Sequence, residues 1–231
     1  MLSAAMAVKK RNYHDLCGLS HALELVGERW AILILRELSY GPKRFTDIRS
    51  GLPAASPNVL SQRLRELESH GIVSRRTLAP PAASKVYELT EWGQELEPTL
   101  RSLGSWAARS PHFPDSGHFS PSSLAMNLET MFLPGEAAGL DMTIGLKLGD
   151  ESFRLRIANS SLELERGEAD DPDAVIETDP MTLVGVLYHG AELGAAEAAG
   201  ALRIEGERDA AAKLPQLFEL PEPVELETAV S

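Results

Sequence analysis

The sequence predicts an α+β protein of two domains, the first mainly helical and the second a mixture of helices and strands. Its 231 residues are 43% apolar, which is enough for two domains of ordinary size to bury a core each. Apolar residues recur at helical spacing up to residue 110, and strand-like runs dominate at first in the remainder. Residues 111–121, which are rich in Pro, Ser and Gly, lie between the two patterns and are typical of a linker.

Charge also divides the chain at this linker. Residues 1–110 hold 15 Lys and Arg against 11 Asp and Glu, whereas residues 111–231 hold 7 against 23. The net charge of −12 therefore combines a basic first half with a strongly acidic second half. Such asymmetry indicates divided roles, and the basic half is the candidate for binding phosphate. We expect one domain over 1–110, a linker over 111–121 and a second domain over 122–231.

The sequence argues against a membrane protein, a secreted protein and an enzyme. No apolar run approaches the roughly 18 to 20 residues of a membrane-spanning helix. The charges of Lys9, Lys10 and Arg11 follow the short apolar start, whereas in a secretory signal they precede it, so we expect a cytoplasmic protein. The single cysteine, Cys17, excludes an internal disulfide framework. The histidines have no metal-ligand spacing and no catalytic or nucleotide-binding motif occurs, so we expect no metal, cofactor or catalysis.

Capping residues and apolar spacing divide the first half into short elements. Gly27 and the pair Gly41-Pro42 end two early helices, and the second of these is apolar nearly all round, as a core helix is. Thr90 begins a last helix, which Pro98 should kink or delay. The predicted elements are helices over 16–26, 28–39, 44–50 and 56–70, strands over 72–77 and 85–89, and the helix after Thr90. Helices followed by a two-stranded ribbon in this order are typical of a winged helix-turn-helix module.

The helix over 56–70 divides into an apolar and a polar face. Ser56 begins it as a hydroxyl cap and Pro57 as a first-turn proline. At 100° per residue its leucines share one face, which must pack inward, and its amide and guanidinium side chains share the other. Asn and Gln match the adenine edge in the major groove, and Arg matches guanine. The inward residues are Leu60, Leu64 and Leu67, and the outward ones are Asn58, Gln62, Arg65 and Ser69, flanked by Ser61 and Arg63. This division predicts a DNA recognition helix, with a solvated face that binds nothing as the alternative.

Basic residues surround this helix in the predicted module. Arg75 and Arg76 on one strand of the wing, with Lys85 on the other, can reach phosphates or the minor groove. The helix N-terminus adds backbone N–H groups that favour phosphate, and residues 9–11 offer a further basic arm. The residues expected to contact double-stranded DNA are Ser56, Asn58, Ser61, Gln62, Arg63, Arg65, Lys43, Arg44, Arg75, Arg76 and Lys85.

Several ordered motifs in residues 13–108 resemble the HxlR-type winged helix-turn-helix regulators. They are LELVGERW at 23–30, ILREL at 34–38, GPKRF at 41–45, SPNVLSQRLRELE at 56–68 and YELTEWG at 87–93. The resemblance implies a homodimer whose first and last helices form the interface, so that two recognition helices lie about one DNA turn apart on an inverted-repeat operator. The expected interface residues are Trp92, Leu96, Leu100, Leu103 and Trp106, each of which could instead belong to the core of its own chain.

Cys17 lies where many members of that family carry a cysteine. Some members use this thiol to sense oxidants or electrophiles, and Arg11 and His14 are the residues nearby in the sequence that could activate it. The interpretation that we favour is a small buried hydrophobic residue. A sensor at this position would need an intersubunit disulfide or an adduct with a small thiol, because the chain has no second cysteine.

The second half resembles sterol-carrier-protein-like domains. The resemblance lies in residues 174–187 with 202–218, in the order strand, Asp-led helix, small-residue stretch, strand ending in Gly, and helix. The predicted elements are helices over 120–132 and 209–220 and after Asp179-Pro180, and strands over 140–148, 152–158, 161–166, 174–178 and 202–207. The resemblance implies an apolar tunnel for a fatty-acyl, sterol or other lipophilic ligand. Its wall candidates are Met142, Ile144, Phe153, Leu155, Leu183 and Leu187, although an ordinary core needs the same residue types.

Three hypotheses of function follow from the sequence. The first is a sequence-specific regulator, expected to be a repressor, that binds DNA as a homodimer and is controlled by a lipophilic molecule in its second domain. The second is a regulator that senses thiol-reactive compounds through Cys17 and has an inert second domain. The third is a lipid-binding protein that uses the winged helix only to dimerise. The charge division and the outward Asn58, Gln62 and Arg65 favour a DNA-binding regulator over the third.

Overall fold

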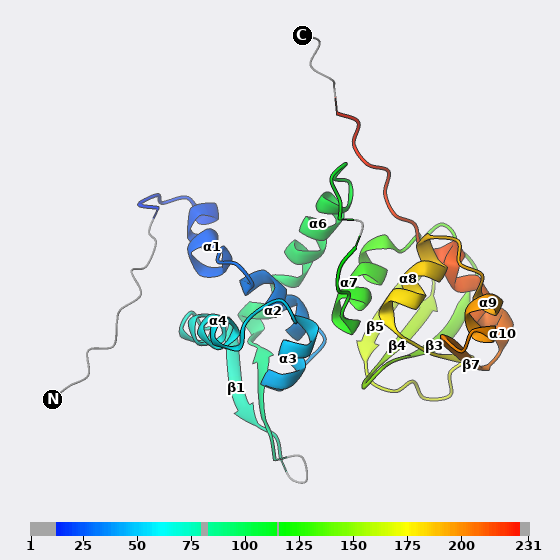
Figure 1. The fold of residues 1–231 in the computed structure, drawn as a ribbon. Helices are drawn as coiled ribbons and strands as arrows, with labels where there is room; N and C mark the ends of the chain where they lie inside the picture. Colours follow the sequence, from blue (N-terminus) through cyan, green and yellow to red (C-terminus); the bar gives the residue numbers. More distant parts are fainter. Residues whose placement is uncertain (1–12, 80–82, 115, 227–231) are drawn as a thin grey trace. The chain divides into compact units, whose positions relative to one another are not determined.

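The computed structural model describes residues 13–79, 83–114 and 116–226, which form two compact units (Figure 1). The first unit comprises the described residues of Met1–Leu38 and Pro42–Glu95, and the second comprises those of Ser39–Gly41 and Leu96–Ser231. The basic residues 9–11 lie outside the described part of the chain. Within that part, no helix is long and apolar enough to cross a membrane.

The first unit has the predicted order of helices followed by a two-stranded wing, so the winged helix-turn-helix prediction is confirmed. Strands β1 and β2 pair antiparallel, with Arg75 opposite Tyr87. The elements are α1 (Gly18–Val26), α2 (Ala31–Leu38), α3 (Phe45–Gly51), α4 (Pro57–Ser69), β1 (Val73–Thr77), β2 (Lys85–Leu89) and the short α5 (Glu91–Gln94).

Helix α2 and the helix predicted after Thr90 differ clearly from their expected bounds. Helix α2 begins at Ala31 rather than at residue 28, because Trp30 has a φ of 78°, which lies outside the helical region. The helix predicted after Thr90 is interrupted: α5 ends at Gln94, and α6 (Glu97–Ala108) starts again with Pro98 in its first turn. Proline is common at this position because the N–H groups of the first turn have no acceptor within the helix, so a residue without an N–H loses no hydrogen bond.

Helix α6 groups with the second unit. Its Arg101 lies 3.2 Å from Glu129, and the Tyr40 hydroxyl donates to the same carboxylate. Burial, together with the charge of Glu129, raises the pKa of Tyr40, so this hydroxyl keeps its proton. Contacts therefore divide the chain near Glu95, ahead of the expected linker over 111–121. The expected division of roles at that linker stays a prediction.

Helix α4 begins and packs as its sequence predicts. The Ser56 hydroxyl accepts a hydrogen bond from Val59 N at 3.3 Å, and Pro57 occupies the first turn. Leu60, Leu64 and Leu67 are at most 1% exposed and lie in the core of the first unit. The opposite face of the helix is therefore directed away from that core.

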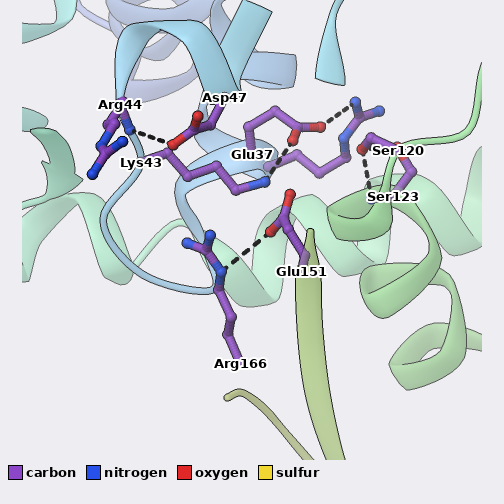
Figure 2. Close-up of polar contacts among 9 residues, drawn as sticks. Glu37, Lys43, Arg44, Asp47, Ser120, Ser123, Glu151 and Arg166 are labelled. Atoms are coloured by element: carbon purple, nitrogen blue, oxygen red, sulfur yellow. Dashed lines mark hydrogen bonds and ion pairs between the residues drawn. The ribbon is translucent and has the colours of Figure 1, made fainter. Parts of the chain in front are cut away.

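A buried ion pair joins the end of α2 to the start of the α3 segment. The Lys43 ammonium donates to the Glu37 carboxylate at 3.0 Å, and both side chains are at most 1% exposed (Figure 2). The backbone of Lys43 pairs with that of Tyr87 on β2 through two hydrogen bonds, which fix its position. The expectation that Lys43 contacts DNA is wrong, because its ammonium group is buried and pairs with the buried Glu37 carboxylate.

Gly51, the last residue of α3, makes room for this carboxylate. A Cβ atom at position 51 would lie 2.4 Å from the Glu37 Oε2 atom, which no side chain could tolerate without displacing the ion pair. The predicted helix over 44–50 ends just before Gly51, and glycine is common where helices end. In the structure, the close approach of a buried charge is the stronger reason for glycine at this position.

The second unit is a five-stranded sheet with helices packed against it, as the α+β prediction requires (Figure 1). The strand order is β5-β4-β3-β6-β7, with β3 and β6 parallel and the other pairs antiparallel. The elements are α7 (Pro121–Met131), β3 (Asp141–Leu148), β4 (Glu151–Ala158), β5 (Ser161–Arg166), β6 (Ala174–Thr178), α8 (Pro180–Tyr188), α9 (Leu193–Ala198), β7 (Leu202–Gly206), α10 (Arg208–Lys213) and the 3-10 helix η1 (Leu214–Leu217).

Local signals explain where α8 begins and where α10 ends. The Asp179 carboxylate caps α8 by accepting from the backbone of Met181 at 2.9 Å and of Thr182 at 3.0 Å. The helix predicted over 209–220 is shorter than expected: α10 ends at Lys213 and a 3-10 turn follows. Pro215 has no N–H to continue the α-helical ladder, which accounts for the change.

We expect Lys43→Met to destabilise the protein by about 3 kcal/mol, because it leaves Glu37 buried with one cation fewer. The measurement is the free energy of unfolding from urea titration followed by circular dichroism. Lys85→Met, which removes the same charge from an exposed strand residue, should change that free energy by less than about 0.5 kcal/mol. Equal losses in the two variants would contradict a stabilising role for the buried pair.

Candidate nucleic-acid interface

The outward face of α4 presents two side chains with free hydrogen-bonding groups. Asn58 and Arg65 are exposed. Within the described part of the chain, neither makes a side-chain hydrogen bond or an ion pair. An amide and a guanidinium on one helix face can pair with adenine and guanine edges in a major groove. Both lie where the sequence analysis expects DNA-contacting residues.

Two other expected residues are held by a neighbour on the same helix. Gln62 Nε2 donates to Glu66 Oε1 at 3.0 Å, and Arg63 Nη1 donates to the other carboxylate oxygen. The Arg63 side chain is only 15% exposed, and its second terminal nitrogen lies 3.8 Å from Glu28. Neither Glu28 nor Glu66 is among the residues expected from the sequence, although the four-residue spacing of Gln62 and Glu66 is a recognised signal of contact along a helix.

The two serines differ in role. The Ser56 hydroxyl oxygen accepts from Val59 N as the helix cap, so Ser56 shapes the N-terminus of α4. Ser61 is half-buried on the flank of the helix. Pro57 has no N–H, and the N–H groups of Val59 and Leu60 donate to Ser56, so the Asn58 N–H is the first-turn backbone donor left for a phosphate at this end of α4.

The wing carries positive charge that is partly compensated. Arg75 and Arg76 are exposed on β1, where Arg75 lies 3.6 Å from Glu68 and Arg76 Nε lies 2.7 Å from Glu88. Lys85 is exposed at the start of β2. Such exposed ion pairs are weak, so a phosphate can compete for the arginines.

Arg44 lies beside the wing hairpin. Its Nε donates to Ser84 Oγ at 3.0 Å, and its backbone N–H donates to Asp47 at the start of α3 (Figure 2). The side chain is exposed. Arg44 therefore remains a candidate phosphate contact, unlike the buried Lys43 that precedes it.

Apolar side chains are exposed on α1 and α6. No residue of α1 is buried, and Leu19 is 70% exposed. On α6, Trp106 is 74% exposed, whereas Leu100 is buried in its own unit. The other exposed apolar residues are Leu16, just before α1, Leu23 on α1 and Leu103 on α6. Of the remaining expected interface residues, Trp92 is exposed and Leu96 is half-buried.

Cys17 is exposed, so the expectation of a buried hydrophobic residue is wrong. It precedes α1, and its backbone N–H donates to the Asp15 carboxylate at 3.0 Å. The hydrogen bond from Ser20, followed by that from Cys17, lowers the pKa of Asp15, so the group beside the cysteine is an anion at neutral pH. The expected neighbour Arg11 lies outside the described residues.

The residues expected to line a ligand tunnel belong to the core of the second unit. Met142, Ile144, Phe153, Leu155, Leu183 and Leu187 are all buried and share one cluster with the sheet and the helices. A separate pocket of about 280 Å³ is lined by none of them. Its lining residues are Val186, Gly190, Ala191, Glu192, Leu193, Ala212 and Pro215. The tunnel remains a prediction.

Comparison with known proteins places the first half in a family. A family described as HxlR-like helix-turn-helix matches residues 25–112. YvaP of Bacillus subtilis (strain 168), described as an uncharacterized HTH-type transcriptional regulator, is 36% identical over 107 residues, which are 45% of this chain and 99% of that protein. The chain belongs to the HxlR-like helix-turn-helix family. The HTH-type transcriptional regulator YodB of the same organism is 40% identical over 86 residues, 37% of this chain and 77% of YodB.

This HxlR-like protein carries a second region that YvaP lacks. Less than half of the chain accounts for 99% of YvaP. The reduced form of YodB from B. subtilis, a solved structure, is 35% identical and covers 44% of this chain and 100% of its own, with a TM-score of 0.39. Residues 124–224 match a different family, described as alkyl sulfatase C-terminal, which supports the sterol-carrier-like resemblance of the second half. The chain thus joins two regions that match separate families.

Within the described residues, no group of three or more His, Cys, Asp and Glu side chains could hold a metal ion.

Proposed function

We propose that this HxlR-like regulator binds double-stranded DNA in a sequence-specific manner, with α4 in the major groove and the wing on the adjacent backbone. The observation that carries the proposal is the outward face of α4, where Asn58 and Arg65 are exposed opposite buried leucines. Arg65 can form a bidentate pair with guanine and Asn58 with adenine. The exposed cations of the wing and Arg44 supply contacts to phosphate, which position the helix without reading sequence.

Charge supports the same orientation on DNA. The half of the chain with α4 and the wing has an excess of Lys and Arg, whereas residues 111–231 have an excess of 16 acidic groups. A duplex is attracted to the first and repelled by the second. The acidic half therefore disfavours binding through the wrong surface.

We expect the affinity for an operator duplex to fall steeply with salt, because bound cations release counterions from the phosphates. Arg65→Ala should cost about 1–3 kcal/mol, confined to one base position. Fluorescence anisotropy with operator duplexes at several salt concentrations measures both effects. Arg154→Ala, which removes an exposed arginine paired with Glu165 in the second unit, is the matched control and should leave the base preference unchanged. Salt-insensitive binding together with a silent Arg65→Ala would refute the recognition-helix assignment.

The proposed DNA-binding form is a homodimer on an inverted-repeat operator. Its support is the pair of exposed apolar faces on α1 and α6. Contact of such apolar surface with water is unfavourable, and exposed apolar patches often mark interfaces. A second copy of the chain offers the same faces, so a two-fold axis can bury them reciprocally. The rival hypothesis is a lipid-binding protein that uses this module only to dimerise. Both hypotheses predict a dimer, but the rival predicts no sequence-specific binding to DNA.

We expect Trp106→Glu to raise the dimer dissociation constant by at least about tenfold, because burial of a large apolar side chain contributes about 1.5–3 kcal/mol. The variant should fold normally, since this side chain is exposed in the single chain. Sedimentation equilibrium measures the change. Met181→Glu, at another exposed apolar residue, is the control and should leave the dimer intact. An unchanged dissociation constant for Trp106→Glu would place the dimer interface elsewhere.

We further propose that a lipophilic molecule bound by the second unit controls DNA binding. The support is the match of residues 124–224 to a family described as alkyl sulfatase C-terminal, together with a sheet and helices that share an apolar core. Such a ligand acts only if its affinity differs between the DNA-competent and incompetent states. A second candidate input is the exposed thiol of Cys17, which reactive small molecules can reach.

Native mass spectrometry of the purified protein distinguishes the two inputs. We expect a non-covalent hydrophobic adduct that denaturation releases and that Cys17→Ser retains. A covalent adduct that Cys17→Ser abolishes, together with loss of an oxidant response in DNA binding, would favour the thiol sensor. Absence of any released molecule, with no effect of added fatty acids or sterols on operator affinity, would contradict ligand control by the second unit.

A further inference from the structure

Glu66 links two side chains on the recognition helix. Its carboxylate oxygens are divided between Gln62 Nε2, 3.0 Å from Oε1, and Arg63 Nη1, which donates to Oε2. Gln62 and Glu66 are four residues apart, so their side chains lie one turn apart on the same face. Both are half-buried, and the exposed Arg65 lies beside them along the helix.

This hydrogen bond determines which way the Gln62 amide faces. A carboxylate only accepts hydrogen bonds, so the amide must turn its nitrogen rather than its oxygen toward Glu66. One of the two N–H groups is thereby used. The amide retains one N–H donor and one carbonyl acceptor for a ligand, which is the pair that adenine N7 and N6 require in the major groove. Guanine presents two acceptors at the same edge, so this fixed pair discriminates against it.

Arg63 holds the carboxylate in this position. Its guanidinium is the partner of the second Glu66 oxygen, lies 3.8 Å from Glu28, and is largely covered. It offsets the charge of Glu66, which would otherwise repel the phosphates of a duplex. The sequence predicts that Arg63 contacts DNA. Its role here is instead to hold the Glu66 carboxylate in place.

We infer that Glu66 is a positioning residue for base recognition: it orients Gln62 so that the protein prefers adenine at one position of its operator. The inference rests on the proposed function of α4 as the recognition helix. It goes beyond that function in two ways: it assigns a role to a residue that touches no base, and it names the base that is preferred. The exposed face of α4 by itself indicates neither.

The experiment uses the full chain and a duplex selected from a random pool by the wild-type protein. Fluorescence anisotropy then measures affinity for that duplex and for its single-base-pair variants. We expect Gln62→Ala and Glu66→Ala each to lower the preference for A·T over G·C at the same position by about tenfold, the lower end of what one bidentate contact contributes. The double variant should lose no more than either single one, because the two residues act on one contact.

Glu68→Ala is the matched control. It removes the same charge two residues away on α4, where Glu68 faces Arg75 at 3.6 Å and not Gln62. Loss of either carboxylate should raise affinity for all duplexes to a similar extent, but only Glu66→Ala should change the preference at one position. A uniform gain in both variants with an unchanged preference would overturn the inference. Glu66→Ala should keep α4 helical, because alanine favours helices. Should this variant unfold, Glu66→Met replaces it, because methionine has a similar length and no carboxylate to accept the hydrogen bond.

The outcomes separate this inference from the proposed function. If Arg65→Ala and Gln62→Ala alter base preference and Glu66→Ala does not, α4 reads DNA and the positioning role of Glu66 is wrong. If the pool yields no preferred sequence, or if Arg65→Ala and Gln62→Ala are both silent, the proposed function fails and the inference fails with it. Loss of preference in Glu66→Ala that persists at equal size in the Gln62→Ala background would also overturn it, because the effect would then not pass through Gln62.

Discussion

Burial of one row of leucines on α4 is the constraint on which the proposed interface depends. Leu60, Leu64 and Leu67 are removed from water almost completely, and each contributes on the order of 1.5–3 kcal/mol by burial. The buried residues of α4 form one stripe along the helix, so the side opposite the leucines faces outward. The exposure of Asn58 and Arg65 is thus a consequence of core packing and does not require a ligand to be present.

Intramolecular ion pairs decide how much of the available charge is left for DNA. Lys43 is committed to the buried Glu37, because withdrawing either partner would leave an isolated charge in the core. Arg63 is largely covered and is held by Glu66, whereas the exposed arginines of the wing pair with the half-buried Glu68 and Glu88. Surface pairs of this kind cost little to exchange for phosphate, whereas the buried pair does not exchange. Fewer cations are therefore available to DNA than the number of basic residues in the first half would indicate.

The two units differ in how completely they satisfy their own apolar surface. The second unit packs its sheet and helices around a continuous core that includes every expected tunnel residue. In the first unit, α1 contributes no buried residue although much of its sequence is apolar. An amphipathic helix derives most of its stability from packing of its apolar face, and the described residues of the single chain leave the apolar side chains of α1 largely uncovered. In the proposed homodimer, a second copy of the chain covers them.

The sequence by itself determined the order of the elements, the cap at Ser56, the two faces of α4 and the family of the first half. These features depend on neighbours within a few residues, whose spacing is visible along the chain. Only the tertiary structure decided that Lys43 is buried, that Gly51 leaves room for a carboxylate and that Cys17 is exposed. Burial and the choice of an ionic partner depend on which elements meet in space, and a basic residue near a turn reads the same in sequence whether it faces solvent or a buried glutamate.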